Sequence, residues 1–232
     1  MKLVILSSAI WGSIFIKENL SEAVISRCAG FEMHTGKLIG QSVTLVEPDD
    51  ESIPAIQDNL LNILDPDYVI SLGDAFGCKK SLNAGDVIIS SAASFLKGDS
   101  PQQTEEVGAQ LKLVDLGLRA TERFSNDERP CKVVVGKVFL NPGTLTTKRK
   151  LTFLPRSDIY CMDRSGFPLT QWIVDGKAPF VLIRTVLPAP RQSEATQFKW
   201  DAAKRNFWII KGIFEGLKPK YVRETARKVD LI

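Results

Sequence analysis

Hydrophobic residues fall into two patterns along the chain, and the first is the short apolar run. Such runs, bounded by Gly, Pro, Asn or Asp, predict buried strands. We expect strands of this kind at 2–6, 68–72, 87–89, 132–140, 159–162 and 179–186. Residues 29–34 and 37–46 are expected to form a hairpin around Thr35-Gly36, because the second arm alternates apolar and polar positions.

The second pattern is apolar residues repeated every three or four positions, which predicts amphipathic helices. We expect these helices at 53–64, 104–123, 167–174 and 193–217, with shorter ones near 14–19 and after Thr144. Strands and helices alternate, apart from the early hairpin, and this order is typical of an α/β protein with a mixed sheet covered on both faces. The 232 residues, 44% of them hydrophobic, suffice for one domain over 1–232.

The segment 67–93 is the centre of this prediction, because it combines two expected strands with glycine-rich connections. Gly73 and Gly77 bracket Asp74-Ala75-Phe76 in what we expect to be a tight turn after the strand 68–72. In open α/β sheets, ligands bind at the carboxyl ends of the strands. A ligand at this turn is therefore one interpretation, and simple chain reversal is the alternative.

Composition excludes several function classes. A formal net charge of +3, with basic residues scattered until the C-terminal end, gives no footprint for nucleic acid. Four widely spaced cysteines without a C-x-x-C pair predict reduced thiols in the cytoplasm, and they predict no metal site. The only histidine, His34, lies in a strand-like alternation and is interpreted as structural rather than as a base.

The N-terminal stretch 3–16 carries no charge and superficially resembles a signal peptide. It is too short to span a membrane, and no small-residue cleavage site precedes Lys17. We interpret its first residues as a central strand of the sheet, and we expect no membrane partner.

Three predicted strand ends gather polar groups, at 73–75, 139–141 and 162–164. Four segments carry a family pattern in order: SLGDAFGCKKSLNAGDVIIS, GKVFLNPGT, IYCMDRSGFPLTQW and APFVLIRTVLP. Together they resemble the nucleoside phosphorylase and nucleosidase superfamily. They are most similar to its branch that hydrolyses 5′-methylthioadenosine and S-adenosylhomocysteine, over most of the chain. The resemblance implies a single mixed sheet, partly barrel-like and flanked by helices, with no cofactor.

The resemblance also implies a set of site residues. Asp163, after Met162, stands where the family places a carboxylate near the ribose hydroxyls. Phe139 would pack on the purine, or lie in the core, and Leu140 follows it at the purine edge. Met162 is also expected to contact the nucleoside. Gly73, Asp74 and Ala75 would line the ribose side.

The chain departs from the family at two catalytic positions. The water-activating glutamate is expected within 10–13, where no carboxylate occurs, and the purine-protonating aspartate falls at Pro188. General acid or base assistance is typically worth about 10²–10⁴ in rate for each group. Asp74 is either a relocated base or a turn former, and its charge disfavours a phosphate-binding phosphorylase.

These residues lead to one functional hypothesis and one alternative. The hypothesis is a divergent nucleosidase-like protein that binds an adenine-type purine nucleoside and hydrolyses its N-glycosidic bond, with Asp163 and Asp74 as catalytic residues. The alternative is an inactive relative, either a nucleoside sensor or a structural subunit. The resemblance also implies a homo-oligomer.

Overall fold

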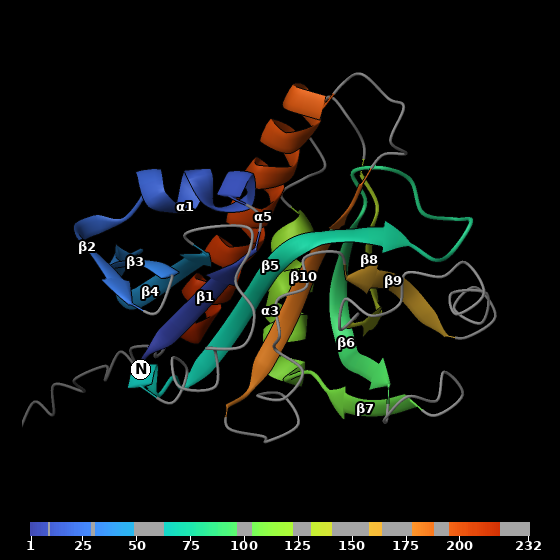
Figure 1. Ribbon diagram of the computed structural model, residues 1–232, viewed down its shortest axis with the longest axis horizontal. Coiled ribbons are helices and arrows are strands. Elements are labelled where there is room, and N and C mark those ends of the chain that lie inside the picture. The colour runs from blue at the N-terminus through green and yellow to red at the C-terminus, as the bar shows by residue number, and fades with distance from the viewer. Residues whose placement is uncertain are drawn as a thin grey trace, which may run out of the picture.

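The computed structural model describes residues 1–8, 10–28, 31–48, 63–96, 104–122, 131–140, 158–163, 178–187 and 195–218. These residues form one ten-stranded mixed sheet with the helices packed against it. Figure 1 shows the longest strands crossing the middle of the molecule. The expected α/β class is confirmed.

Five strands close into a ring, which is the barrel-like part of the sheet. They are β5 (Tyr68–Gly77), β6 (Val87–Leu96), β8 (Val133–Phe139), β9 (Ile159–Asp163) and β10 (Phe180–Val186). The order β5-β10-β6-β8-β9 returns to β5, because β10 pairs both with β5 and with β6. Closure brings strand ends that are far apart in the sequence to one rim.

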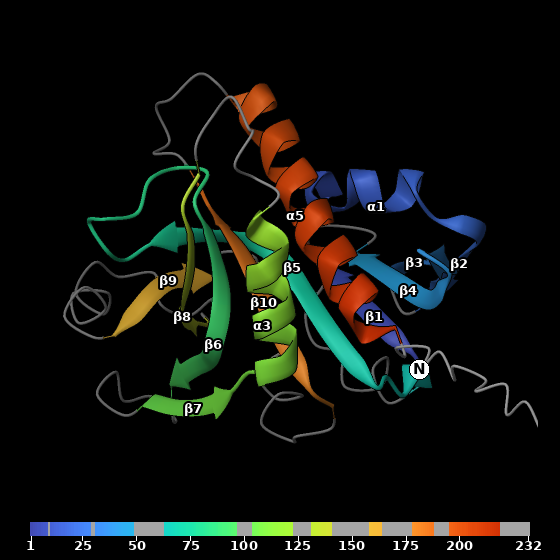
Figure 2. The same cartoon turned by 180° about the vertical axis from the view of Figure 1, so that it is seen from behind.

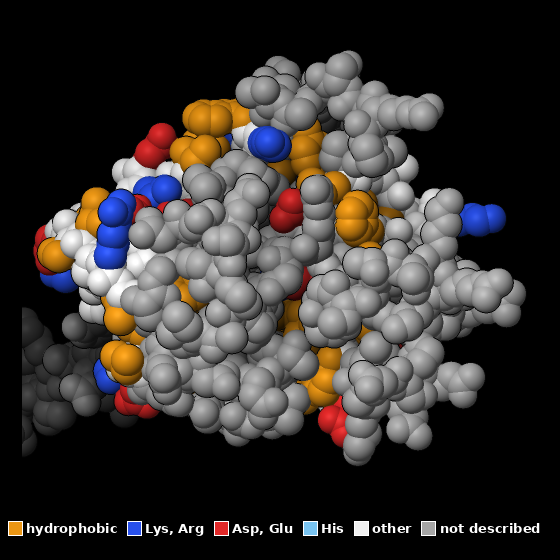
Figure 3. Space-filling view, in the orientation of Figure 1, with side chains coloured by type: hydrophobic (Ala, Val, Ile, Leu, Met, Phe, Trp, Pro, Cys, Tyr) orange, Lys and Arg blue, Asp and Glu red, His pale blue; other side chains and the backbone are white. Residues whose placement is uncertain are grey.

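The remaining strands extend the sheet from this ring. β1 (Leu3–Ser7) pairs with β5, and β4 (Gln41–Pro48), β3 (Phe31–Leu38) and β2 (Ser21–Cys28) follow it outward. β7 (Thr104–Gly108) pairs with β6. The polar side chains of this β2–β4 extension gather on the left of Figure 3.

Two long helices lie side by side across one face of the sheet, as Figure 2 shows. They are α3 (Leu111–Ala120) and α5 (Ala195–Leu217), while the short η1 (Ile10–Ser13) and α1 (Ile14–Glu18) pack against α5. The core forms where Ile89 of β6 and Ile209 and Ile213 of α5 meet, around Gly117 of α3. The predicted helix 167–174 and most of 53–64 lie outside the described residues.

The predicted hairpin around Thr35-Gly36 is wrong. β3 runs straight through both residues, and the chain reverses at Ile39-Gly40, where both φ angles are positive (56° and 76°). Gly36 serves close approach instead, because a Cβ there would lie 2.8 Å from the Ser21 carbonyl oxygen. β2, whose residues are mostly exposed, was not predicted because it shows no alternation of burial.

Two further predictions need correction. The expected turn at 73–77 is strand: β5 continues to Gly77, because Gly73, Asp74 and Ala75 pair with β10. The expected helix 104–123 begins only at Leu111, because its first part pairs with β6 as β7. In both cases tertiary pairing overrides the local signal.

Candidate functional site

A buried ion pair lies at the centre of the predicted site. Arg184 Nη2 donates to Asp163 Oδ2 at 3.1 Å, and the side chains are 0% and 2% exposed. The guanidinium also donates to the Ser71 carbonyl oxygen at 2.8 Å and to Ser71 Oγ at 3.0 Å. These bonds fix the position of Asp163 because two ring strands, β5 and β10, hold its partner.

Strand pairing places the other predicted residues around Asp163. Ala75 on β5 is the direct register partner of Asp163 on β9. Met162 pairs with Phe76 on one side and with Phe139 of β8 on the other. Ala75, Phe139, Met162 and Asp163 are therefore neighbours in the ring, and all four are buried.

The remaining predicted residues lie beside this group. Gly73 pairs with Arg184, and Asp74 pairs with Thr185, both across the β5–β10 ladder. Leu140 follows β8 and donates its N–H to the Ser94 carbonyl oxygen at 2.8 Å. Asp74 is half-buried. The structure thus brings all seven predicted site residues to three neighbouring strands, although it does not test their roles.

Arg184 and Ser71 are the site residues to which sequence reasoning assigned no role. The available signal was a single arginine inside an otherwise apolar strand. A charged side chain in a strand buried on both faces requires a buried partner. Ser71 gave no comparable signal, because a serine in a strand is common.

Two cysteines close to the site are poor nucleophiles. Burial raises the pKa of Cys161, the neighbour of Asp163, well above its usual value. Burial also raises the pKa of Cys78, just past β5, to about 11. The thiolate is the reactive form of cysteine, so neither group offers thiol chemistry at neutral pH.

The segment 10–13 is tied to a neighbouring strand. Ser13 Oγ donates to Glu47 Oε1, and Lys17 Nζ donates to Glu47 Oε2 at 2.9 Å. Ser8, just before η1, donates its Oγ to the Leu72 carbonyl oxygen at 3.0 Å, next to Gly73. The segment 10–13 itself contains no carboxylate. Glu47 of β4 places a carboxylate beside Ser13. Pro188 lies outside the described residues.

One further group of side chains could hold a metal. Glu32, His34 and Glu47 place one donor atom each within 4.8 Å of one another. The group lies on β3 and β4, away from the ring strands that hold Asp163.

Comparison with known proteins finds relatives among the 5′-methylthioadenosine/S-adenosylhomocysteine nucleosidases. No protein-family profile matches the chain. It is 26% identical over 214 residues to a 5′-methylthioadenosine/S-adenosylhomocysteine nucleosidase from a Geobacillus species, covering 87% of this chain and 91% of that protein. It is 29% identical over 171 residues to a nucleosidase of the same name from Pseudoalteromonas translucida, covering 68% and 72%.

Solved structures agree with these relatives. The nucleosidase of Colwellia psychrerythraea in complex with adenine has a TM-score of 0.74 at 23% identity, covering 94% of this chain and 96% of that chain. The chain has the nucleoside phosphorylase-like fold of these nucleosidases. Its fold is also that of the Neisseria meningitidis nucleosidase bound to methylthio-immucillin-A, with a TM-score of 0.74 at 17% identity, covering 93% and 99%.

The sequence identity to these relatives is low, at 29% or less. None of the helices in the described residues is long and apolar enough to cross a membrane.

Proposed function

We propose that this protein is a divergent member of the nucleoside phosphorylase/nucleosidase superfamily. It binds an adenine-type purine nucleoside at the rim of the five-strand ring and hydrolyses its N-glycosidic bond. The observation that carries the proposal is the buried Asp163–Arg184 pair, surrounded by Ala75, Phe139 and Met162. The relatives support it, since the Colwellia protein holds adenine and the Neisseria protein holds methylthio-immucillin-A.

Each residue has a role that its chemistry suits. Asp163 accepts hydrogen bonds from the ribose hydroxyls, and Arg184 holds the carboxylate in position through its hydrogen bond. Phe139 and Met162 offer apolar surface to the purine, and Leu140 lies at its edge. Gly73 and Ala75 lie on the ribose side, where their small size lets the sugar approach the backbone.

The reaction adds water to the anomeric carbon and releases the base with a proton. The ribose becomes cationic in the transition state, so a fixed negative charge at Asp163 favours that state over the ground state. Asp74, beside Gly73, is the proposed base for the water. With no carboxylate at 10–13 and a proline at 188, acid and base assistance are reduced, and we expect slow turnover.

A second candidate is nucleoside binding without turnover. One observation favours it: at the segment where the family has its water-activating glutamate, the structure has Ser13, which is bonded to Glu47. A sensor of this kind would keep the Asp163–Arg184 pair and would release no base.

The test follows free base from methylthioadenosine, S-adenosylhomocysteine and inosine, with and without phosphate. The proposal expects slow, phosphate-independent release of adenine from the first two compounds and a large loss in Asp74→Asn. Tight nucleoside binding without release supports the sensor. Phosphate-dependent release contradicts both candidates and indicates a phosphorylase.

The remaining properties also belong to the proposal. We propose that residues 1–232 form a single domain, that the protein is a cytoplasmic homo-oligomer, and that it needs no cofactor for hydrolysis. Gel filtration with light scattering tests the oligomer, since a monomer at micromolar concentration contradicts that part.

A further inference from the structure

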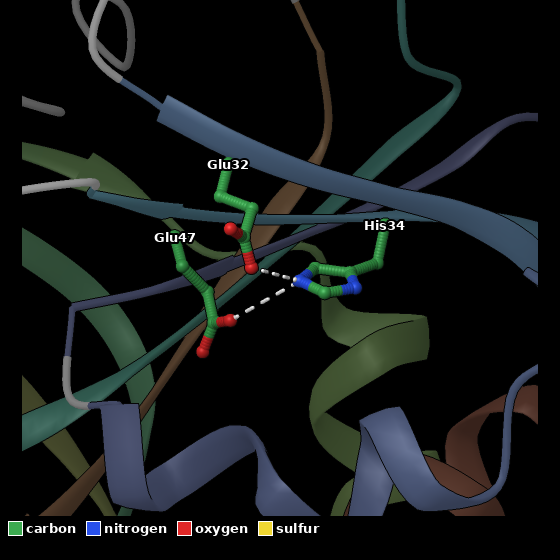
Figure 4. A group of neighbouring side chains, drawn as sticks. All are labelled: Glu32, His34 and Glu47. Atoms are coloured by element: carbon green, nitrogen blue, oxygen red, sulfur yellow. Dashed lines mark hydrogen bonds and ion pairs between the residues drawn. The ribbon is translucent and has the colours of Figure 1, made fainter. Parts of the chain in front are cut away.

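Glu32, His34 and Glu47 converge on one point, as Figure 4 shows. His34 Nε2 lies 2.7 Å from Glu32 Oε1 and 3.7 Å from Glu47 Oε2. The His34 and Glu47 side chains are 9% and 5% exposed, while Glu32 is 27% exposed. One imidazole nitrogen therefore faces two carboxylates, with an opening to solvent on the Glu32 side.

The strands hold this arrangement without help from loops. Glu32 on β3 is the direct cross-strand partner of Glu47 on β4. His34 lies two residues beyond Glu32 and therefore projects from the same face of the sheet. Adjacent paired strands are rigid supports, so the three donor atoms are preorganised.

Among the residues that the structure describes, Lys17 and Arg27 are the charged side chains outside the cluster that form ion pairs with its carboxylates. Lys17 Nζ lies 2.9 Å from Glu47 Oε2, and Ser13 Oγ donates to the other Glu47 oxygen. Arg27 Nη2 lies 3.2 Å from Glu32 Oε2, the oxygen that faces away from His34. Ser13 and Arg27 thus engage the outer oxygens and leave the inner ones directed toward the imidazole.

We propose that His34 Nε2, Glu32 Oε1 and Glu47 Oε2 form a binding site for a divalent transition-metal ion, with Zn²⁺ as the best fit. One imidazole and two carboxylates are Zn²⁺ ligands with bonds of about 2.0–2.2 Å, and water from the open side completes a tetrahedron. Ligand atoms at these bond lengths lie roughly 3.3 Å apart, so only small side-chain movements are needed. Ser13 and Arg27 orient the ligating carboxylates from behind.

Lys17 competes with the metal for the Glu47 carboxylate. Its ammonium contacts the Glu47 oxygen that the metal would use, and its side chain is 29% exposed. Metal binding must turn this flexible side chain toward solvent. Removing the ammonium should therefore strengthen metal binding, whereas a purely structural charge cluster gives no such result.

The experiment is a calorimetric titration of Zn²⁺ into the full chain. The proposal predicts one equivalent bound by the wild type, at least tenfold weaker binding by His34→Gln, and tighter binding by Lys17→Met. Mg²⁺ should not bind, because it prefers all-oxygen sites.

Two controls separate this site from adventitious thiol binding. Cys28→Ser, at the end of β2, should bind Zn²⁺ as the wild type does, and bound Co²⁺ should show no thiolate charge-transfer band. Unchanged binding in a folded His34→Gln variant, or no gain in Lys17→Met, would overturn the proposal. The cluster lies on β3 and β4, whereas Asp163 lies on β9, so the two sites share no residue. Nucleoside binding by the metal-free protein therefore tests the proposed function separately from Zn²⁺ binding.

Discussion

At the scale of single residues, the Asp163–Arg184 pair is a buried structural contact that lies at the centre of the proposed site. Both groups are buried, so the attraction between them offsets part of the desolvation penalty of each charge. Arg184 also binds Ser71, which ties the pair to β5. The sequence and the resemblance pointed to Asp163. Arg184 could not be paired with Asp163 from the sequence, because the two residues lie on strands that meet only in the folded ring.

The first prediction concerns this pair. Asp163→Leu should lower the free energy of unfolding by about 3–5 kcal/mol, because it leaves the Arg184 guanidinium buried without its carboxylate. The double variant Asp163→Leu/Arg184→Met should lose less than the single variant. Chemical denaturation of both proteins gives the coupling energy, and strictly additive losses would contradict the buried pair.

The second prediction concerns pH and Glu32. The hydrogen bond with His34, followed by that with Arg27, lowers the pKa of Glu32 below its usual value of 4.5. Glu32 therefore adds stability above about pH 4.5, and this stability disappears as the pH falls through the lower folded-state pKa. Between about pH 5 and 3, the wild type should lose more stability than Glu32→Gln. Parallel curves from urea denaturation would count against this electrostatic role.

At the scale of elements, local signals predicted the buried strands well. The apolar runs that became β1, β8 and β10 are short and rich in Val, Ile and Leu, and the run 87–89 marked the start of β6. The long helix α5 was equally clear from its spacing. These elements bury apolar residues in a regular pattern, so the local sequence suffices to identify them.

Other elements depend on partners far away in the chain. Gly36 resembles a turn residue, but it is a point of close approach to Ser21. β7 resembles the start of a helix, but it pairs with β6. Gly73 suggested a turn, but it lies within β5. The pairing of β5 with both β9 and β10 cannot be seen in the local sequence.

The third prediction tests the contact between β8 and β9. A Cβ on Gly136 would overlap the Tyr160 ring, so Gly136→Ala must displace that ring and disturb the ladder that places Phe139 beside Met162. The expected loss in unfolding free energy is about 1–3 kcal/mol. Gly108→Ala is the matched control, because nothing lies within 4 Å of its added carbon. An equal loss in both variants would contradict the close packing.

At the scale of the whole molecule, closure of the ring brings the residues of the proposed site together. Asp74, Phe139 and Asp163 come from three strands separated by long stretches of sequence, and β9 lies between the other two. The order of the four family segments predicted this meeting, whereas composition and periodicity alone gave only the α/β class. The Glu32–His34–Glu47 group was not predicted, because cross-strand pairing, rather than spacing, brings Glu47 to the other two residues.

The measurement that tests the central claim most directly is the binding of methylthioadenosine to the wild type and to Asp163→Asn, by isothermal titration calorimetry. Asp67→Asn, at an exposed aspartate near the N-terminus, is the control. The account predicts binding by the wild type and the control, and at least about tenfold weaker binding by folded Asp163→Asn, because hydrogen bonds to a charged group contribute about 1.5–3 kcal/mol. Equal affinity of all three proteins, or no binding by the wild type, would contradict the account.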